Sequence, residues 1–284
     1  MTSLSAAATN APARERGRVS FVIPTRNSGQ TIAACVRSAI SQSGDVEVVV
    51  VDNHSEDGTS ALAADAGADT LIVAGPERSA QRNLGWARSS GEFVAFIDSD
   101  MVLRPGLAAD IVANFERSAT HGALVLPERS FGVGYLARSR DLEKRAYLGD
   151  RRAEAARAFR ASALDEVGGY DESVNAFEDY ELPDRVERAG WTLGRTSVGV
   201  DHDEGRVQVR ELFAKKRYYG RTLSSVRGPG GTEFDWARRG GRDWRRLLRA
   251  MATDPLHAPG MVALKAVDGT GLLAGHISGR RSGR

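Results

Sequence analysis

The sequence predicts an α/β protein built on a parallel sheet that carries its ligand site where the strands end. Two observations predict this class. Strand-like apolar runs alternate with amphipathic helical segments up to about residue 127, and polar clusters follow three of the runs. Such alternation is typical of sheets whose crossovers are helices, and these sheets bind ligands at the carboxyl ends of their strands. The 284 residues, 41% of them hydrophobic, suffice for one large α/β domain or two small ones.

Each element follows from its own pattern. Runs rich in β-branched and aromatic residues indicate buried strands, and apolar residues repeating every three to four positions indicate helices. Ser28 or Thr31 is a suitable cap for the first helix, and Pro105 fits the first turn of another. The sequence therefore predicts strands at 19–23, 46–51, 70–73, 91–97, 123–126 and 197–200, and helices at 32–40, 59–66, 79–88, 179–189 and from 105 onward.

Composition narrows the class of protein. The only cysteine, Cys35, has apolar neighbours at helical spacing, so it is expected in the core, and one cysteine excludes an internal disulfide framework. No apolar stretch approaches the roughly 18–20 residues that span a bilayer. Residues 1–17 lack the apolar centre of a signal peptide, so we predict a disordered leader and a cytoplasmic protein.

Charge is distributed unevenly. From Arg206 onward the chain has 17 Lys/Arg and 6 Asp/Glu, a balance of +11, whereas the preceding part carries −9. A basic segment of this kind either faces an anion or keeps the chain in solution. Apolar residues at helical spacing follow Trp244, and we expect them to pack on the catalytic domain or on a second subunit in a homodimer. Peripheral contact with an anionic membrane is the alternative.

The most informative motif is Asp98-Ser99-Asp100, which ends an apolar strand. Side chains two positions apart on a strand lie on the same side, so the two carboxylates need a positive charge between them. Mg²⁺ and Mn²⁺ prefer such oxygen ligands and leave sites for substrate phosphates. The alternative is a polar turn without a ligand.

Two more polar clusters are expected at the same sheet edge. Residues 24–27 follow the first strand and residues 52–59 follow the second, where Asp52 could accept a hydrogen bond from a base edge. Each cluster alone fits ordinary turn chemistry. Three clusters at one edge of one sheet indicate a binding site.

These motifs resemble those of family 2 glycosyltransferases, which have the GT-A fold, a mixed and mostly parallel sheet flanked by helices. The resemblance covers about residues 18–225, and it rests on the segments at 22–27, 50–59, 82–87, 91–100, 159–172, 177–182 and His202. It implies inverting transfer from a nucleotide-diphosphate sugar, most readily a UDP-sugar and next a GDP-sugar. It also implies a nucleotide-sugar half (18–127) and an acceptor half (128–225), and the charge and helical spacing of the remaining residues predict a basic helical extension (226–284).

The resemblance also assigns residues. Pro24, Thr25, Arg26, Asp52, Arg82, Asp98 and Ser99 would line the donor site, Asp100, Asp98 and His202 would hold Mn²⁺ or Mg²⁺, and Asp179 would be the catalytic base. Arg26 and Asn53 differ from the residues common in the family, so the resemblance does not identify the base or the sugar. The acceptor hydroxyl belongs to an unidentified molecule, either lipid-linked or a small natural product.

The residues give independent support for two of these roles and leave alternatives. Asp179 begins a predicted helix, whose dipole favours the ionised carboxylate, while desolvation beside an acceptor would raise its basicity. The alternative is that Glu178 and Asp179 only cap this helix. His202 follows a predicted strand and could complete a metal shell, or it could be a surface histidine.

Competing functions are a noncatalytic nucleotide-sugar binding module and a nucleotidyltransferase. The retention of Asp98, Asp100 and Asp179 argues against the first, and a poor glycine-rich loop at 24–29 argues against the second. The basic cluster at 215–221 could grip a phosphate, stack on nucleic acid or form a solvated helix face. No nucleic-acid partner is expected.

Overall fold

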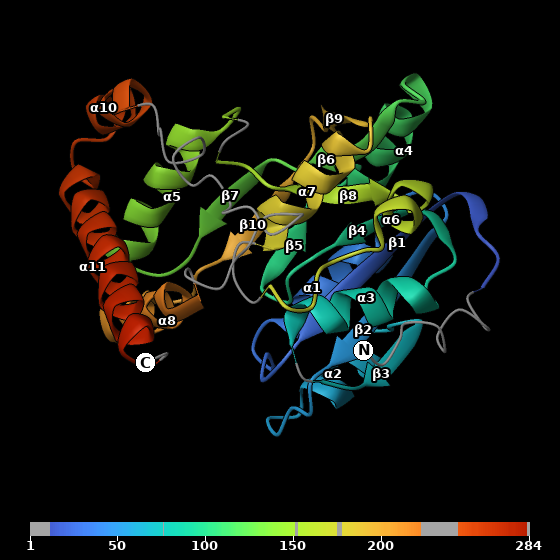
Figure 1. The fold of residues 1–284 in the computed structure, drawn as a ribbon, viewed down its shortest axis with the longest axis horizontal. Coiled ribbons are helices and arrows are strands. Elements are labelled where there is room, and N and C mark those ends of the chain that lie inside the picture. The colour runs from blue at the N-terminus through green and yellow to red at the C-terminus, as the bar shows by residue number, and fades with distance from the viewer. Residues whose placement is uncertain (1–11, 76, 151–152, 175–177, 223–243, 283–284) are drawn as a thin grey trace. The chain divides into compact units, whose positions relative to one another are not determined.

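The structure, a computed structural model, describes residues 12–75, 77–150, 153–174, 178–222 and 244–282 (Figure 1). They form two compact units. Within the described residues, unit 1 comprises 12–127, 156–173 and 178–200, and unit 2 comprises the remainder. Residues 1–11 of the predicted leader and the predicted start of the basic extension at 226 lie outside the described residues.

Unit 1 contains a seven-stranded sheet. Its strands lie in the order β3 (Thr70–Val73), β2 (Val46–Asp52), β1 (Glu15–Thr25), β4 (Gly91–Phe96), β8 (Ala156–Arg160), β6 (His121–Val125) and β9 (Thr192–Arg195). The first four strands are parallel, β8 is antiparallel to both of its neighbours, and β6 and β9 are parallel. The predicted mixed, mostly parallel sheet is therefore confirmed.

Helices pack on both faces of this sheet. They are α1 (Ile32–Ile40), α2 (Thr59–Asp65), α3 (Arg78–Arg88), α4 (Leu107–Arg117), α6 (Ala161–Val167) and α7 (Glu178–Arg188). Five of these helices follow the predicted pattern with local differences, whereas α6 was not predicted. The helix expected from Pro105 begins at Leu107, because Gly106 has a left-handed φ of 88° and stands outside the helix.

Two strands differ from the expected ones. β1 already begins at Glu15, within the segment predicted as a leader, because the backbone N–H of Glu15 donates to the carbonyl of Ser90 and so extends the pairing with β4. The strand expected at 197–200 runs instead over β10 (Val200–Asp203), so His202 lies within a strand rather than after one. Four strands were not predicted from the sequence: β8 and β9 of this sheet, β7 (Glu128–Phe131), and the short β5 (Met101–Leu103), which follows the Asp98–Asp100 segment.

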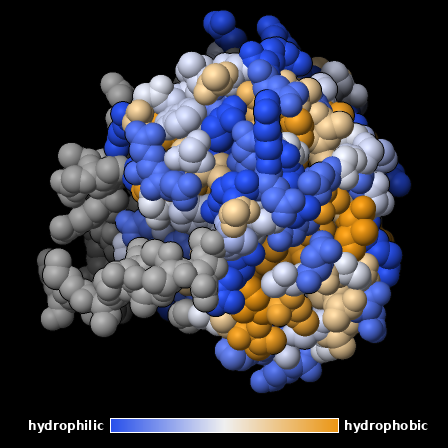
Figure 2. Space-filling model, turned by 90° about the vertical axis from the view of Figure 1, so that its right-hand side faces the viewer, coloured by the Kyte–Doolittle hydropathy of each residue, from blue (hydrophilic) through white to orange (hydrophobic). Residues whose placement is uncertain are grey.

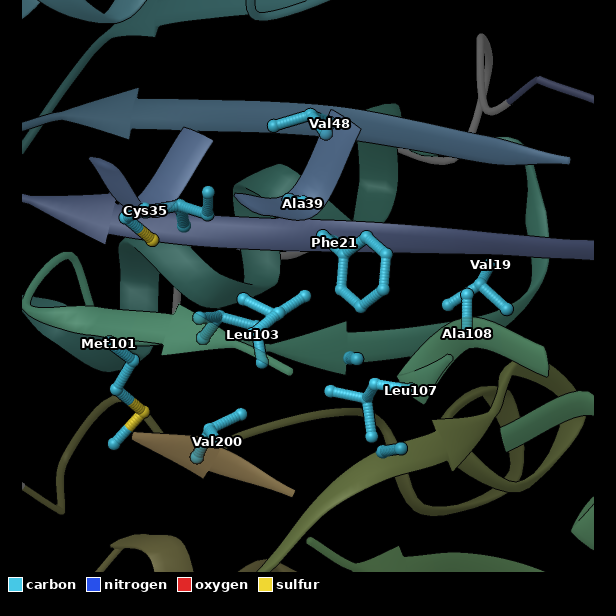
Figure 3. Close-up of a cluster of buried hydrophobic side chains, with 14 of the residues drawn as sticks. Val19, Phe21, Cys35, Ala39, Val48, Met101, Leu103, Leu107, Ala108 and Val200 are labelled. Atoms are coloured by element: carbon cyan, nitrogen blue, oxygen red, sulfur yellow. The ribbon is translucent and has the colours of Figure 1, made fainter. Parts of the chain in front are cut away.

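Alternating strand residues build the two cores of unit 1. Phe21, Val48 and Phe93 face one side, where they pack with α1 and α4, and Figure 3 shows Phe21 among Cys35, Leu107 and their neighbours. The adjacent positions Val22, Val49 and Val94 face the other side, against α3, α6 and α7. Because every second residue is buried on each face, the register of the strands is fixed.

Some apolar side chains of the protein are exposed to solvent. β3 is an edge strand of the sheet, and Leu71 and Val73 on it are exposed. Figure 2 shows a face that is largely hydrophilic and on which hydrophobic side chains gather in one patch.

Unit 2 is mainly helical. It contains β7 (Glu128–Phe131), most of β10, α5 (Tyr135–Tyr147), α8 (Val209–Thr222), α10 (Trp244–Thr253) and α11 (Ala258–Ser282). α11 lies along α8 (Figure 1), and glycines allow this close approach, since a Cβ added to Gly275 would lie 2.1 Å from the carbonyl oxygen of Arg217. Leu142 of α5 packs against Met261 of α11 and Leu247 of α10. In the described ranges, no helix combines the length and apolar content that a bilayer span requires.

Phe21→Ala should destabilise unit 1 strongly. Phe21 is fully buried in the larger core, so its truncation removes apolar contacts and leaves a cavity that should cost about 3–5 kcal/mol of unfolding free energy. Urea denaturation followed by circular dichroism measures this change. Leu71→Ala on the exposed edge strand is the control, and an equal loss in both variants would contradict the assigned core.

Candidate functional site

The three predicted polar clusters meet at the carboxyl edge of the sheet in unit 1. The backbone N–H of Ser28, after β1, donates to Thr59 Oγ1 (2.8 Å), and that of Gly29 donates to Asp57 Oδ2 (2.9 Å). The hydroxyls of Ser28 and Ser99 lie 2.8 Å apart and share a hydrogen bond. The loops after β1, β2 and β4 are therefore joined by direct contacts, as expected for adjacent parallel strands.

The residues expected at the base pocket occupy the ends of β1 and β2. Pro24 is buried in β1 beside Val51, whereas Arg26 is exposed. Asp52 is buried, and its carboxylate accepts hydrogen bonds from Ser55 and Ser60, so it orders its own loop.

Thr25 provides a polar group for a ligand in this region. Its hydroxyl oxygen is buried and has no hydrogen-bond partner among the described residues. Gln81 of α3 donates from Nε2 to the carbonyls of Thr25 (3.0 Å) and Val51 (2.7 Å), which fixes the ends of both strands against α3. An unsatisfied hydroxyl at such an edge suits a bound polar molecule.

A buried arginine connects the other acidic residues. Arg82 of α3 donates from Nη2 to Asp98 Oδ1 (2.9 Å). Its Nη1 donates to Asp179 Oδ1 (2.8 Å) and Glu178 Oε1 (3.1 Å) at the start of α7. The second oxygen of Asp98 accepts from Arg157 Nη1 on β8 (3.1 Å). One guanidinium thus joins the end of β4 to the first residues of α7.

The electrostatics of this group follow from its burial. The Arg82 side chain has no exposed surface, and its Cζ lies 5.0 Å from the ring centre of Tyr170. Burial by itself lowers the pKa of the Arg82 guanidinium, but the surrounding acidic groups, Asp179 first among them, raise it well above its usual value. Burial and then the neighbouring Asp179 raise the pKa of Glu178, against the opposing charge of Arg82.

Asp100 is the carboxylate best suited to a divalent cation. Both oxygens of Asp98 are engaged by guanidiniums, so Asp98 is already neutralised within the protein. Asp100 is half-buried at the same strand end. Burial raises the pKa of the Cys35 thiol beneath the motif, and the negative charge of Asp100 raises it further. Among the described residues, no three His, Cys, Asp or Glu side chains form a metal-binding group. The donor set fits a Mg²⁺ or Mn²⁺ ion that takes most of its ligands from water and a diphosphate.

His202 lies in unit 2, on β10. Its Nδ1 is 2.8 Å from Glu128 Oε1 and 4.0 Å from Glu204 Oε1, and Lys144 also pairs with Glu128. A neutral imidazole that donates from Nδ1 to Glu128 presents its Nε2 lone pair as a ligand. Asp98 and Asp100 belong to unit 1, so a metal site that includes His202 stays a prediction.

Sequence reasoning missed Arg157 and treated Glu178 only as an alternative cap. Arg157 alternates with apolar residues in β8 and is only 9% exposed. A charged residue at a buried strand position was the available signal, because such a charge needs an acidic partner. The expected place of Arg82 near the nucleotide stays a prediction, and the structure shows both of its terminal nitrogens on carboxylates.

Comparison with known proteins gave a family match and more distant structural relatives. Residues 20–168 match the sequence profile described as glycosyl transferase family 2. The pre-mycofactocin glycosyltransferase of Mycobacterium tuberculosis is 31% identical over 238 residues, which cover 75% of this chain and 49% of that protein. The chain thus spans about half the length of this curated relative.

Two solved structures share the fold. The mannosyltransferase PcManGT from Pyrobaculum calidifontis, in complex with GDP-Man and Mn²⁺, has a TM-score of 0.56 and 18% identity over 95% of this chain and 89% of its own. Glucosyl-3-phosphoglycerate synthase from Mycobacterium tuberculosis, in complex with Mg²⁺ and UDP, has a TM-score of 0.50 and 21% identity over 78% of this chain and 80% of its own.

Glu178→Gln should change the pH dependence of stability. Because the folded state holds the Glu178 proton more strongly than the unfolded chain does, wild-type stability falls as the pH rises from the usual Glu pKa of 4.5 towards the raised one. The variant lacks this titration, so the wild-type Tm should fall relative to that of the variant over this range. Differential scanning fluorimetry against pH measures it. Glu187→Gln, exposed on the same helix, should follow the wild type, and parallel profiles for all three proteins would contradict the assignment.

Proposed function

Because this chain belongs to glycosyl transferase family 2, we propose that it transfers a sugar from a nucleotide-diphosphate sugar to an acceptor hydroxyl, with inversion at the anomeric carbon. The observation that carries the proposal is the bridge that Arg82 makes between Asp98 and Asp179. A donor-side carboxylate and a candidate base are thereby held at one edge of the sheet. A noncatalytic binding module has no need for this arrangement.

The donor is proposed to be a UDP-sugar first and a GDP-sugar next. Its base would lie at the ends of β1 and β2, against Pro24, Thr25, Arg26 and Asp52, where the Thr25 hydroxyl offers an unused hydrogen-bonding group. The two related structures contain UDP and GDP-Man, which supports testing these bases first. A thermal-shift panel of UDP-, GDP-, CDP- and dTDP-sugars, each with Mn²⁺ or Mg²⁺, identifies the donor by the largest rise in Tm.

Different residues are proposed for metal binding and for proton transfer. Asp100 would be the main protein ligand of the Mg²⁺ or Mn²⁺ ion, with Asp98 oriented by Arg82 and Arg157 towards the sugar, the ribose or the metal. When bound, the cation supplies Lewis-acid stabilisation of the departing diphosphate. Asp179 accepts the proton of the acceptor hydroxyl, since its carboxylate is partly exposed and is positioned by its ion pair with Arg82.

The acceptor is proposed to be either a small natural product or a lipid-linked molecule. The relative of 31% identity is named for pre-mycofactocin, which is accordingly the first small acceptor to assay. A lipid-linked acceptor would require this cytoplasmic enzyme to reach a membrane surface. Alternatively, the basic extension packs on a second subunit in a homodimer.

Asp100→Ala should reduce metal-dependent turnover about 10²–10³-fold, because it removes the main protein ligand of the cation that stabilises the leaving diphosphate. Hydrolysis of the donor identified by the thermal-shift panel, with and without EDTA, provides the measurement. Asp65→Ala, exposed at the end of α2, is the control. Full turnover of Asp100→Ala in EDTA would exclude the proposed metal role.

Asp179→Asn should lower turnover about 10²–10⁴-fold with little change in donor affinity, because the amide keeps the shape of the side chain but accepts no proton. Steady-state kinetics and donor titration separate the two quantities. Glu187→Gln on the same helix serves as the matched control. If the folded variant retained turnover, Asp179 would only cap α7, and product NMR showing retention at the anomeric carbon would refute inversion.

A further inference from the structure

The last helix of unit 2 has an inverted distribution of charged and apolar side chains. Two of its charged residues pair with α5: Lys265 Nζ lies 2.8 Å from Glu143 Oε1, and Asp268 Oδ2 lies 3.0 Å from Arg140 Nη1. Lys216 of α8 approaches the other oxygen of Asp268 at 3.7 Å. The ionic groups of α11 are therefore largely satisfied inside the unit.

From Ala258 to Gly279, where the exposure of the side chains is described, the exposed residues of α11 carry no charge. They include small and apolar residues at helical spacing, namely Val262, Ala263, Ala266, Gly269, Thr270, Leu273 and Ile277. Leu273 is 59% exposed and Val262 is 51% exposed. A helix that turns its apolar side outward in this way presents a surface that another apolar phase can cover.

The preceding helix of the unit, α10, also exposes apolar residues and adds positive charge. Trp244 and Leu248 of α10 are exposed, and so are Arg245 and Arg249 beside them. Leu256, in the connection from α10 to α11, is 70% exposed. Figure 1 shows α10 followed directly by α11 in unit 2.

The charge count of this surface is unusual. Of the 16 exposed residues described between Trp244 and Gly279, only Arg245 and Arg249 are charged, and none is acidic. A solvated surface typically has about 25–35% charged residues of both signs, which would be about four or five here. We name these 16 residues the α10–α11 face. They are Trp244, Arg245, Leu248, Arg249, Ala252, Thr253, Pro255, Leu256, Pro259, Val262, Ala263, Ala266, Gly269, Thr270, Leu273 and Ile277.

We propose that the α10–α11 face binds the surface of an anionic lipid membrane. Tryptophan is favoured at the boundary between headgroups and acyl chains, and leucine and isoleucine insert below it. Arg245 and Arg249 match the negative potential of anionic headgroups, and no acidic residue on the face opposes it. The helices lie on the membrane without crossing it.

A second copy of the chain suits this face less well. A two-fold interface brings the same surface together from both copies, so the two arginines of each copy would meet a face that offers no acidic partner. An anionic membrane supplies the complementary charge directly. The inference concerns binding alone and does not require the proposed transfer activity, so the two can fail separately.

Sedimentation with lipid vesicles tests the proposal on the full chain. Vesicles of equal parts phosphatidylcholine and phosphatidylglycerol should bind the protein at low ionic strength, and pure phosphatidylcholine vesicles should bind it much less. Binding should weaken in about 1 M NaCl, where the Debye length falls to about 3 Å. Absence of binding to the anionic vesicles at low salt, or equal binding to both compositions, would overturn the proposal.

Two double variants locate the contact. Arg245→Gln/Arg249→Gln should lower the partition coefficient about 30-fold, from about fivefold for each basic residue near an anionic surface. The matched control is Arg37→Gln/Arg88→Gln, which removes two exposed charges from unit 1 and should bind like the wild type. Circular dichroism confirms that each variant is folded, and equal loss of binding in both pairs would show nonspecific attraction instead.

Leu273→Gln/Ile277→Gln tests whether the apolar residues of the α10–α11 face contribute to membrane binding. It also tests whether a second copy of the chain covers this face instead. This variant should also bind the anionic vesicles more weakly, because it removes the inserting side chains without altering charge. Light scattering on the same proteins reports the oligomeric state. If the wild type were a dimer that this variant dissociated, while vesicle binding was unaffected, the face would be an interface between copies and the proposal would be wrong.

Discussion

The site depends on one buried guanidinium. Arg82 has no exposed surface, and it forms ion pairs with Asp98, Glu178 and Asp179, which reduces the repulsion among these carboxylates at the edge of the sheet. Removing one partner from a buried ionic group costs about 3–5 kcal/mol, because the remaining charges are left uncompensated. The carboxylates proposed for the donor side and for the acceptor side are thus linked through a single side chain.

Much of the fold could be predicted because it depends on local patterns. The strands at 46–51 and 70–73 and the helix at 32–40 were predicted within one residue, since their apolar periodicity and burial agree. Membership of glycosyl transferase family 2 confirms the resemblance that the motifs indicated. The meeting of the loops after β1, β2 and β4 also followed from the sequence, because parallel strands end at one edge.

The contacts of the site could not be read from the sequence in the same way. Arg82 and Asp179 are 97 residues apart, and pattern reasoning identifies a charged residue without identifying its partner. Arg157 was missed because the strand that carries it, β8, was not predicted from the sequence. The inward charges of α11 could not be predicted either, because the α5 partners of Lys265 and Asp268 are 122 and 128 residues away in the sequence.

The central claim is that Arg82 positions Asp98 and Asp179 for transfer, and Arg82→Lys tests it most directly. A lysine keeps the charge but lacks the planar fork that reaches separate carboxylates. Circular dichroism first establishes that the variant is folded. Its turnover should then be about 10²-fold lower, because the reacting groups are misplaced, while the donor dissociation constant is nearly unchanged. Wild-type turnover in folded Arg82→Lys, or a loss confined to donor affinity, would contradict the account.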